Sequence, residues 1–138
     1  MVFIEKIDDE WLGIRGVQTD KNGVSQDFEA SISNRSQCCE YWNLWINNVP
    51  FEDFKLVEEY NKPISNIQWN DKREKVKVEE GESKDGNKWR DKTENWACVD
   101  ITFEDSTVLL LDFNCGHNGY YSHEVKIEFE GKLDAQRI

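Results

Sequence analysis

The sequence lacks an apolar run that approaches the roughly 18 residues needed to span a bilayer. Residues 1–10 also lack the basic start and the apolar stretch of a signal peptide. Gly13 and Gly16 do not form a phosphate-binding loop, because the lysine and the helix that such a loop needs are absent. We therefore expect a cytoplasmic protein with no membrane partner and no phosphate loop.

The cysteines and histidines lack the spacing of a metal site. Cys38 and Cys39 are adjacent and Cys115 stands close to His117, whereas structural zinc sites use wider paired spacings. No glycine-framed nucleophile accompanies the cysteines either. We interpret these three cysteines and Cys98 as free thiols, and we expect no metal, no cofactor and no enzymatic activity.

Positive charge is scarce relative to negative charge. The 138 residues include 28 acidic and 17 basic side chains, which gives a formal net charge of −11. Residues 1–60 carry 12 acids and 5 bases, residues 61–92 carry 7 acids and 9 bases, and residues 93–138 carry 9 acids and 3 bases. Such a surplus disfavours nucleic acid and anionic membranes as partners and favours basic proteins.

Aromatic side chains, in contrast, are plentiful. Six Trp, seven Phe and four Tyr offer enough apolar surface to argue against disorder, although 33% of the residues are charged. A chain of 138 residues is also close to the commonest size of one domain. We predict a single domain over residues 1–138, of the α+β class, mostly β and built on an antiparallel sheet.

The first half of the chain contains several strand patterns. Residues 2–7 and 11–17 predict two short strands. Apolar and polar residues alternate over residues 24–33, which is typical of a strand with one wet face. Residues 38–46 are rich in aromatic and branched side chains, so we predict a central strand there.

The middle of the chain changes character after Pro50. Apolar side chains at helical spacing predict one short helix near residues 50–60, and residues 64–69 predict another strand. Residues 71–92 are nearly all charged or turn-forming. We expect an exposed charged hairpin or loop in that region.

Residues 96–129 predict a C-terminal three-stranded meander with turns at residues 104–106 and 117–119. A two-residue turn at Asn118 and Gly119 would mix apolar and charged side chains on one face. We therefore predict three-residue loops, with Gly119 left-handed. The core face of this meander then consists of Ala97, Val99, Ile101, Phe103, Leu109, Leu111, Phe113, Cys115, Tyr121, His123, Val125 and Ile127.

The opposite face of the predicted meander is acidic. Asp112 and Glu124 face each other beside Cys98, and two facing carboxylates need a cation, a basic partner or water. No cleft or histidine accompanies them, so a solvated acidic face is favoured over an acid–base pair. His123 is interpreted as a hydrogen-bonded core histidine. The predicted partner-binding residues are Asp27, Glu29, Asp100, Asp112 and Glu124, with Trp11 or Trp89 as an aromatic anchor.

Two short motifs resemble an uncharacterised family of small proteins from tailed phages and prophages. They are Gln-Cys-Cys-Glu at residues 37–40 and Asn-Gly-Tyr-Tyr-Ser at residues 118–122. In that family a Cys-Cys-Glu segment precedes a short helix, and a C-terminal strand pair turns at the Asn-Gly-Tyr-Tyr-Ser motif. His117 and His123 depart from the family pattern. The resemblance implies a phage context and a β-rich fold, and it implies no catalytic residue.

Charge and resemblance together suggest a function. We predict a non-enzymatic acidic protein of phage or mobile-element type that acts in the cytoplasm of a bacterial host. It would inhibit a nucleic-acid-handling or defence protein by occupying a basic surface, as an anti-CRISPR protein does. An immunity protein that neutralises a bacterial toxin is an alternative with the same sequence features. A second alternative is a protein that sequesters a small, nucleotide-like ligand in a pocket lined by Arg15, His117, Tyr120 and Tyr121.

Overall fold

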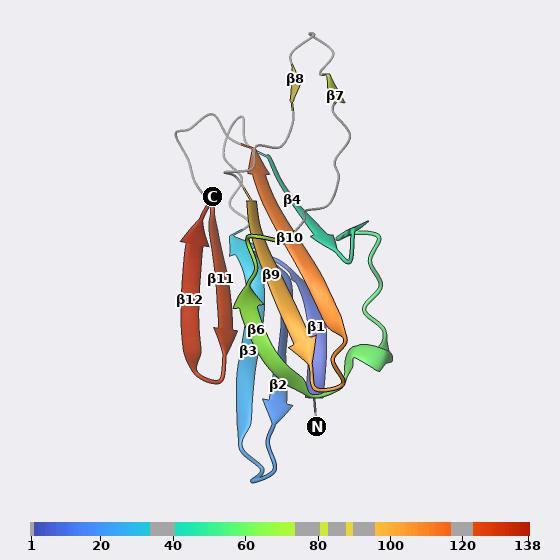
Figure 1. Cartoon of the computed structure of the whole chain (residues 1–138), viewed down its shortest axis with the longest axis vertical. Helices are drawn as coiled ribbons and strands as arrows, with labels where there is room; N and C mark the ends of the chain where they lie inside the picture. Colours follow the sequence, from blue (N-terminus) through green and yellow to red (C-terminus); the bar gives the residue numbers. More distant parts are fainter. Residues whose placement is uncertain (1, 34–40, 74–80, 83–87, 90–95, 117–122) are drawn as a thin grey trace.

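The computed structural model describes residues 2–33, 41–73, 81–82, 88–89, 96–116 and 123–138. These residues form two antiparallel sheets of five strands each and a separate pair of two-residue strands (Figure 1). Sheet A has the order β1-β2-β3-β11-β12, and sheet B has the order β5-β4-β10-β9-β6. The strands are β1 Val2–Asp8, β2 Trp11–Thr19, β3 Ser25–Ser33, β4 Tyr41–Ile46, β5 Val49–Pro50, β6 Ile64–Trp69, β7 Gly81–Glu82, β8 Lys88–Trp89, β9 Trp96–Phe103, β10 Val108–Gly116, β11 Glu124–Phe129 and β12 Lys132–Arg137.

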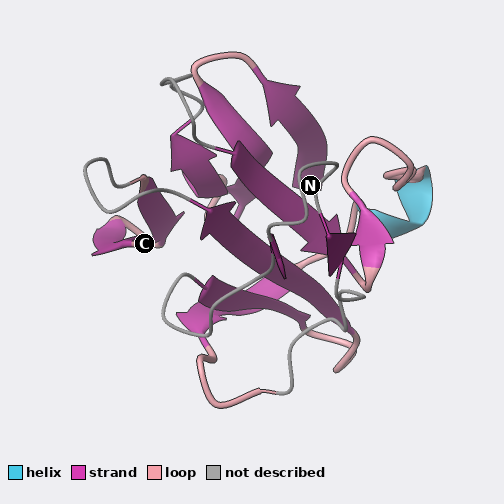
Figure 2. Cartoon of the chain, turned by 90° about the horizontal axis from the view of Figure 1, so that it is seen from above, coloured by secondary structure: helices cyan, strands magenta, loops and turns pink. Residues whose placement is uncertain are grey.

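One hydrophobic core joins the two sheets, and it is built by period-2 alternation along their strands. The view from above shows strands throughout the described structure, with a short helical turn at the periphery (Figure 2). The predicted β-rich class is therefore confirmed. The largest fully buried side chains are Phe28, Phe103, Phe113, Leu12, Ile14, Ile32, Ile46, Ile64, Ile101, Leu109, Leu111 and His123.

The hairpin between β9 and β10 follows the sequence prediction. The Phe103 N–H donates to the Thr107 carbonyl at 2.9 Å, which closes a three-residue loop. Ser106, the last residue of that loop, is left-handed with φ of 73°. The resulting register pairs Leu111 with Val99 and Phe113 with Ala97, so the predicted core face of these two strands is confirmed from Ala97 to Phe103 and from Leu109 to Phe113. The side chain of Cys115, which was predicted on the same face, lies outside the described part of the structure.

The predicted position of the third strand of the meander is wrong. β10 is hydrogen-bonded to β4 and β9, whereas β11 lies in the other sheet between β3 and β12. The expected turn at residues 117–119 lies outside the described residues. Because β4 occupies the edge of β10 that β11 was expected to use, Val125 and Ile127 reach the core from the opposite sheet.

The predicted helix near residues 50–60 is also wrong. Only a 3-10 turn, η1 at Glu58–Tyr60, forms after a single turn in which Asp53 and Phe54 donate to the Pro50 carbonyl at 2.9 Å. Phe54 is buried as the spacing suggested, but Val57 is 47% exposed.

The segment that follows Pro50 lies along the outer edge of β1 instead of coiling. The Lys6 ammonium donates to the carbonyls of Phe51 at 2.5 Å and Phe54 at 2.8 Å. The Ile4 N–H donates to the Asn61 side chain at 3.2 Å. The two Lys6 bonds use carbonyls that a helix would need for its own ladder. The Asn61 bond protects the edge strand β1 from other partners.

Strand β12 was missing from the prediction because its residues are nearly all polar and exposed. It follows β11 through a two-residue turn in which Glu130 and Gly131 have φ of 52° and 77°. In the described part of the chain, no helix has the length and apolar character needed to cross a membrane.

Candidate functional site

The outer face of sheet A carries five carboxylates. Alternation along β1, β3 and β11 places the side chains of the hydrophobic core on one side of the sheet and these acidic side chains on the other. Each acid is exposed or partly exposed. The five residues are Glu5 on β1, Asp27 and Glu29 on β3, and Glu124 and Glu128 on β11.

Basic side chains bind two of these acids. The Arg15 guanidinium lies 2.7 Å from Glu5, and the Lys126 ammonium lies 3.1 Å from Glu29. The hydrogen bond to Glu5 raises the pKa of Arg15 above its ordinary value, so the arginine stays charged. Glu124 stands opposite Arg137 in the register of β11 and β12, but no ion pair joins Glu124 to a base among the described residues.

In the described part of the chain, two carboxylates of the face have neither an ion pair nor a basic residue opposite them in the strand register. Asp27 is exposed and Glu128 is partly exposed. Among the residues that the structure describes, no ion pair joins either of them to a lysine or an arginine. An exposed carboxylate without an internal base is available to a cation from outside the chain.

Aromatic side chains accompany the acids on this face. The Lys126 ammonium lies 4.1 Å from the centre of the partly buried Trp11 ring, close enough for a cation–π interaction. Phe3, on the edge strand β1, is 50% exposed. A cavity of about 430 Å³ crosses the face between Phe3 and Glu128. We name this surface the acidic face, defined by Phe3, Glu5, Trp11, Arg15, Asp27, Glu29, Glu124, Lys126 and Glu128.

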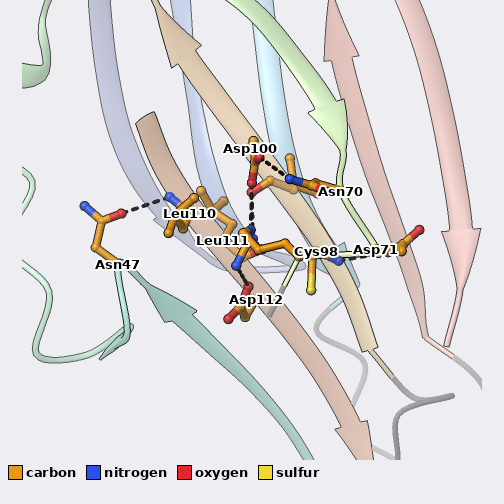
Figure 3. A network of polar contacts seen from close by, with 10 residues as sticks. Asn47, Asn70, Asp71, Cys98, Asp100, Leu110, Leu111 and Asp112 are labelled. Atoms are coloured by element: carbon orange, nitrogen blue, oxygen red, sulfur yellow. Dashed lines mark hydrogen bonds and ion pairs between the residues drawn. The ribbon is translucent and has the colours of Figure 1, made fainter. Parts of the chain in front are cut away.

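The outer face of sheet B is different, and the prediction for it is wrong. Asp100 and Asp112 were expected on an exposed acidic surface, but their residues are only 8% and 1% exposed. Figure 3 shows both carboxylates in a polar network over β9 and β10. Glu124 does not share this face with them, because its strand belongs to sheet A.

Arg73 explains how two neighbouring carboxylates are buried on sheet B. Its Nε lies 2.9 Å from Asp100, and its Nη1 lies 2.6 Å from Asp112. The remaining guanidinium nitrogen donates to the carbonyls of Leu111 at 3.3 Å and Val99 at 3.5 Å. One planar cation therefore supplies the counter-charge that the sequence pattern required.

The charge state of Arg73 follows from this geometry. Burial lowers its pKa, but the charge and hydrogen bond of Asp112 and the charge of Asp100 outweigh that effect and raise the pKa above its ordinary value. Asn70 adds a hydrogen bond to Asp100 at 2.7 Å, and Asp71 accepts the Cys98 N–H at 3.2 Å. The network is a structural anchor that fixes residues 70–73 on sheet B.

The remaining predicted residues are scattered or lie outside the described part of the chain. Trp89 pairs with Gly81 in the short β7–β8 ladder, and its side chain is not described. His117, Tyr120 and Tyr121 lie outside the described residues, so the predicted ligand pocket is represented only by Arg15. Arg15 lies in β2, where it is bound to Glu5.

The described thiol and histidine are buried. Cys98 is a fully buried thiol that lies opposite Asp112 in the β9–β10 register, as predicted. His123 is 2% exposed, with its Nδ1 at 2.9 Å from the Ser33 carbonyl, which confirms a hydrogen-bonded core histidine. Cys38 and Cys39 lie outside the described residues. In the described parts of the chain, no three His, Cys, Asp or Glu side chains are arranged to hold a metal ion.

Comparisons with known proteins give one result. A family model described as a domain of unknown function, DUF7448, matches residues 4–127. No curated protein and no solved structure matches the chain. The matched range includes β2 and β3 completely and most of β1 and β11, so it covers the acidic face except for Phe3 and Glu128.

Proposed function

Because the chain belongs to the DUF7448 family, whose function is unknown, we propose a function from the acidic face itself. We propose that the protein is a non-enzymatic binding protein that occupies a basic surface of another protein. The observation that carries this proposal is the pair Asp27 and Glu128, two accessible carboxylates without an internal base among the described residues, which line one cavity with the exposed ring of Phe3.

Charge supports a basic protein as the partner. A net charge of −11 repels nucleic acid and anionic lipid and attracts a basic surface over a distance of about a Debye length. Aromatic side chains within a charged surface are typical of binding hot spots, because they bury apolar area at the centre of an interface. The acidic face combines both features on one rigid sheet.

We further propose the biological setting that the two sequence motifs suggested. The partner would be a bacterial nucleic-acid-handling or defence protein, and this chain would be an inhibitor of phage or mobile-element type. A surface that binds phosphates also attracts an ordered row of carboxylates. The acidic face would then occupy the site where the partner holds nucleic acid.

A capture experiment tests the binding function. The immobilised wild-type protein is incubated with bacterial lysate at increasing salt, and retained proteins are identified by mass spectrometry. The double variant Asp27→Lys/Glu128→Lys reverses the charges of these two residues. The matched control Glu58→Lys/Glu59→Lys makes the same charge change at exposed residues of η1, outside the acidic face.

The expected result is a basic protein that wild type and control both retain at low salt and that the face variant loses. Retention should weaken as salt rises, because exposed charges are screened. Equal retention by the face variant and the control would contradict the proposal. Identification of a secreted toxin as the retained protein would replace the inhibitor with an immunity protein.

A further inference from the structure

Strand β3 is longer than the strand that lies beside it. β2 pairs with β3 as far as Ser25, whereas β11 pairs with β3 only from Glu29 onward. Figure 1 shows the β2–β3 hairpin extending beyond the β11–β12 turn. Among the described residues, Ser25–Phe28 therefore have a strand partner on one side and none on the other. We name this stretch the open edge.

In each strand of sheet A, alternate residues form their backbone hydrogen bonds with opposite neighbours, and this alternation shows which backbone groups the open edge presents. His123 and Ile138 exchange both backbone bonds at 3.0 Å, so the alternate residues Glu124, Lys126 and Glu128 bond toward β3. Their partners on β3 include Glu29 and Ser31. Alternate residues of a strand bond to the same side, so Ser25 and Asp27 follow Glu29 and Ser31, and their N–H and C=O groups point toward the open edge.

Two other edges of the sandwich are capped by side chains. Asn61 accepts the Ile4 N–H of β1. This bond agrees with the same alternation, which directs the Ile4 N–H away from β2. Gln18 closes the first residue of β6 by donating to the Ile64 carbonyl at 3.0 Å and accepting the Ile64 N–H at 2.7 Å. Within the described structure no comparable side-chain cap covers the backbone of Ser25 or Asp27.

A cavity of about 340 Å³ lies at the open edge. Its apolar wall consists of Val24, Phe28 and Phe129, and Val24 is 51% exposed. Three carboxylates line it, and no base is among its lining residues in the described chain. The Asp20 carboxylate is already engaged by the N–H groups of Asn22 and Val24, so the two carboxylates left for an outside cation are Asp27 and Glu130.

We propose that the open edge receives an extended, basic segment of a partner protein by strand addition. The segment would bond to the backbone of Ser25 and Asp27, as peptides do when they extend a sheet. One of its lysine or arginine side chains would enter the cavity, with its aliphatic stem against Phe28 and Phe129 and its charged head between Asp27 and Glu130. This inference rests on the proposed function and names the mode of binding.

The choice of occupant follows from charge. A second copy of this chain carries a net charge of −11 and is repelled, and an acidic peptide is repelled by the three carboxylates of the cavity. An arginine or lysine side chain fits both the apolar wall and the carboxylates. Backbone bonding alone does not discriminate between partners, so the cavity supplies the specificity.

Fluorescence anisotropy with a labelled peptide of alternating arginine and valine tests the inference. The variant Glu130→Lys changes the cavity and leaves the acidic face intact. Its control, Glu104→Lys, makes the same change in the exposed turn between β9 and β10. The expected result is binding that weakens on the order of tenfold in Glu130→Lys and is unchanged in the control, since one charge-assisted contact is lost.

A second measurement is independent of protein variants. Two versions of the same peptide are N-methylated on alternate residues, one on every arginine and one on every valine; one version should lose binding, because only one set of amides faces β3 and completes the ladder. Hydrogen exchange should show new protection of the Ser25 and Asp27 amides with the unmodified peptide. Absence of binding, equal binding by Glu130→Lys and the control, undiminished binding of both methylated peptides, or protection confined to another strand would each overturn the inference.

Failure of the peptide experiment can be distinguished from failure of the proposed function. If the peptide fails to bind but the lysate partner is still lost from Asp27→Lys/Glu128→Lys, the open edge is not the docking site and the acidic face remains one. If the peptide fails and that variant still retains every partner, both proposals are contradicted.

Discussion

The outer faces of the two sheets carry carboxylates at similar strand positions and use them in opposite ways. On sheet B, Asp100 and Asp112 are buried and share one guanidinium from Arg73. On sheet A, the acids are at least partly exposed, and Asp27 and Glu128 have no base among the described residues. The difference shows that an acidic strand pattern alone does not define a binding surface, because a single distant arginine can convert it into a structural anchor.

Removal of the shared guanidinium should produce the largest effect. In Arg73→Met, two buried carboxylates lose their counter-charge, and we expect the free energy of unfolding to fall by about 3–5 kcal/mol. Urea denaturation measures this change. The triple variant Arg73→Met/Asp100→Asn/Asp112→Asn should recover part of the loss.

The same test on sheet A uses Arg15→Met. Because the Arg15–Glu5 pair is exposed, we expect no measurable loss of stability. Comparable losses from Arg15→Met and Arg73→Met would mean that the two faces do not differ as described.

Substitution of Gly16 should be the next largest effect, because it distorts the sheet that carries the acidic face. A Cβ atom at Gly16 would overlap the Phe3 carbonyl and lie 2.5 Å from the Phe28 ring. We expect Gly16→Ala to destabilise the protein by about 1–3 kcal/mol through overpacking. Equal urea midpoints for wild type and Gly16→Ala would contradict the close approach of Phe3 and Phe28.

Charge reversal on the acidic face should change stability little. Asp27→Lys/Glu128→Lys is expected to stay within about 0.5 kcal/mol of wild type, as surface substitutions usually do. Asp112→Lys, at a buried position, should prevent stable folding, and circular dichroism during thermal unfolding distinguishes the two. A large loss of stability in the first variant would show that Asp27 and Glu128 are structural, as Asp100 and Asp112 are.

The smallest effect on stability concerns Asp105, an exposed acid that forms an ion pair with Lys62. Hydrogen bonds from Lys62 and Thr107 lower the pKa of its carboxyl to about 2, from 3.8. A folded-state pKa below the unfolded value stabilises the protein above pH 3.8, and this contribution is lost as the pH falls toward about 2. The stability difference between wild type and Asp105→Asn should therefore shrink over that interval in acid titrations. A difference that stays constant would show that Lys62 does not hold Asp105 in this way.

The parts of the fold that the sequence predicts are those set by local rules. The β9–β10 hairpin could be predicted because loop length and alternation together fix its register. Alternation also places Val125 and Ile127 in the core, but it does not say which sheet supplies them. Alternation and loop length therefore could not predict that β11 pairs with β3 in sheet A and not with β10.

The same distinction between local rules and distant contacts applies to the candidate site. The outward direction of Asp27 and Glu29 follows from the alternation of β3 and was predicted. Burial of Asp100 and Asp112 was not predictable in this way, because Arg73 is 27 and 39 residues away from them in the chain. The only available signal was a basic residue just after the β6 strand, within a segment interpreted as an exposed hairpin or loop.

Hydrogen exchange of the protein with and without its captured partner tests the central claim most directly. We predict that the partner slows amide exchange on β3 and β11, which carry Asp27 and Glu128, and leaves β9, β10 and the Arg73 segment unchanged. Slower exchange confined to β9, β10 and residues 70–73 would contradict the claim that sheet A presents the binding face.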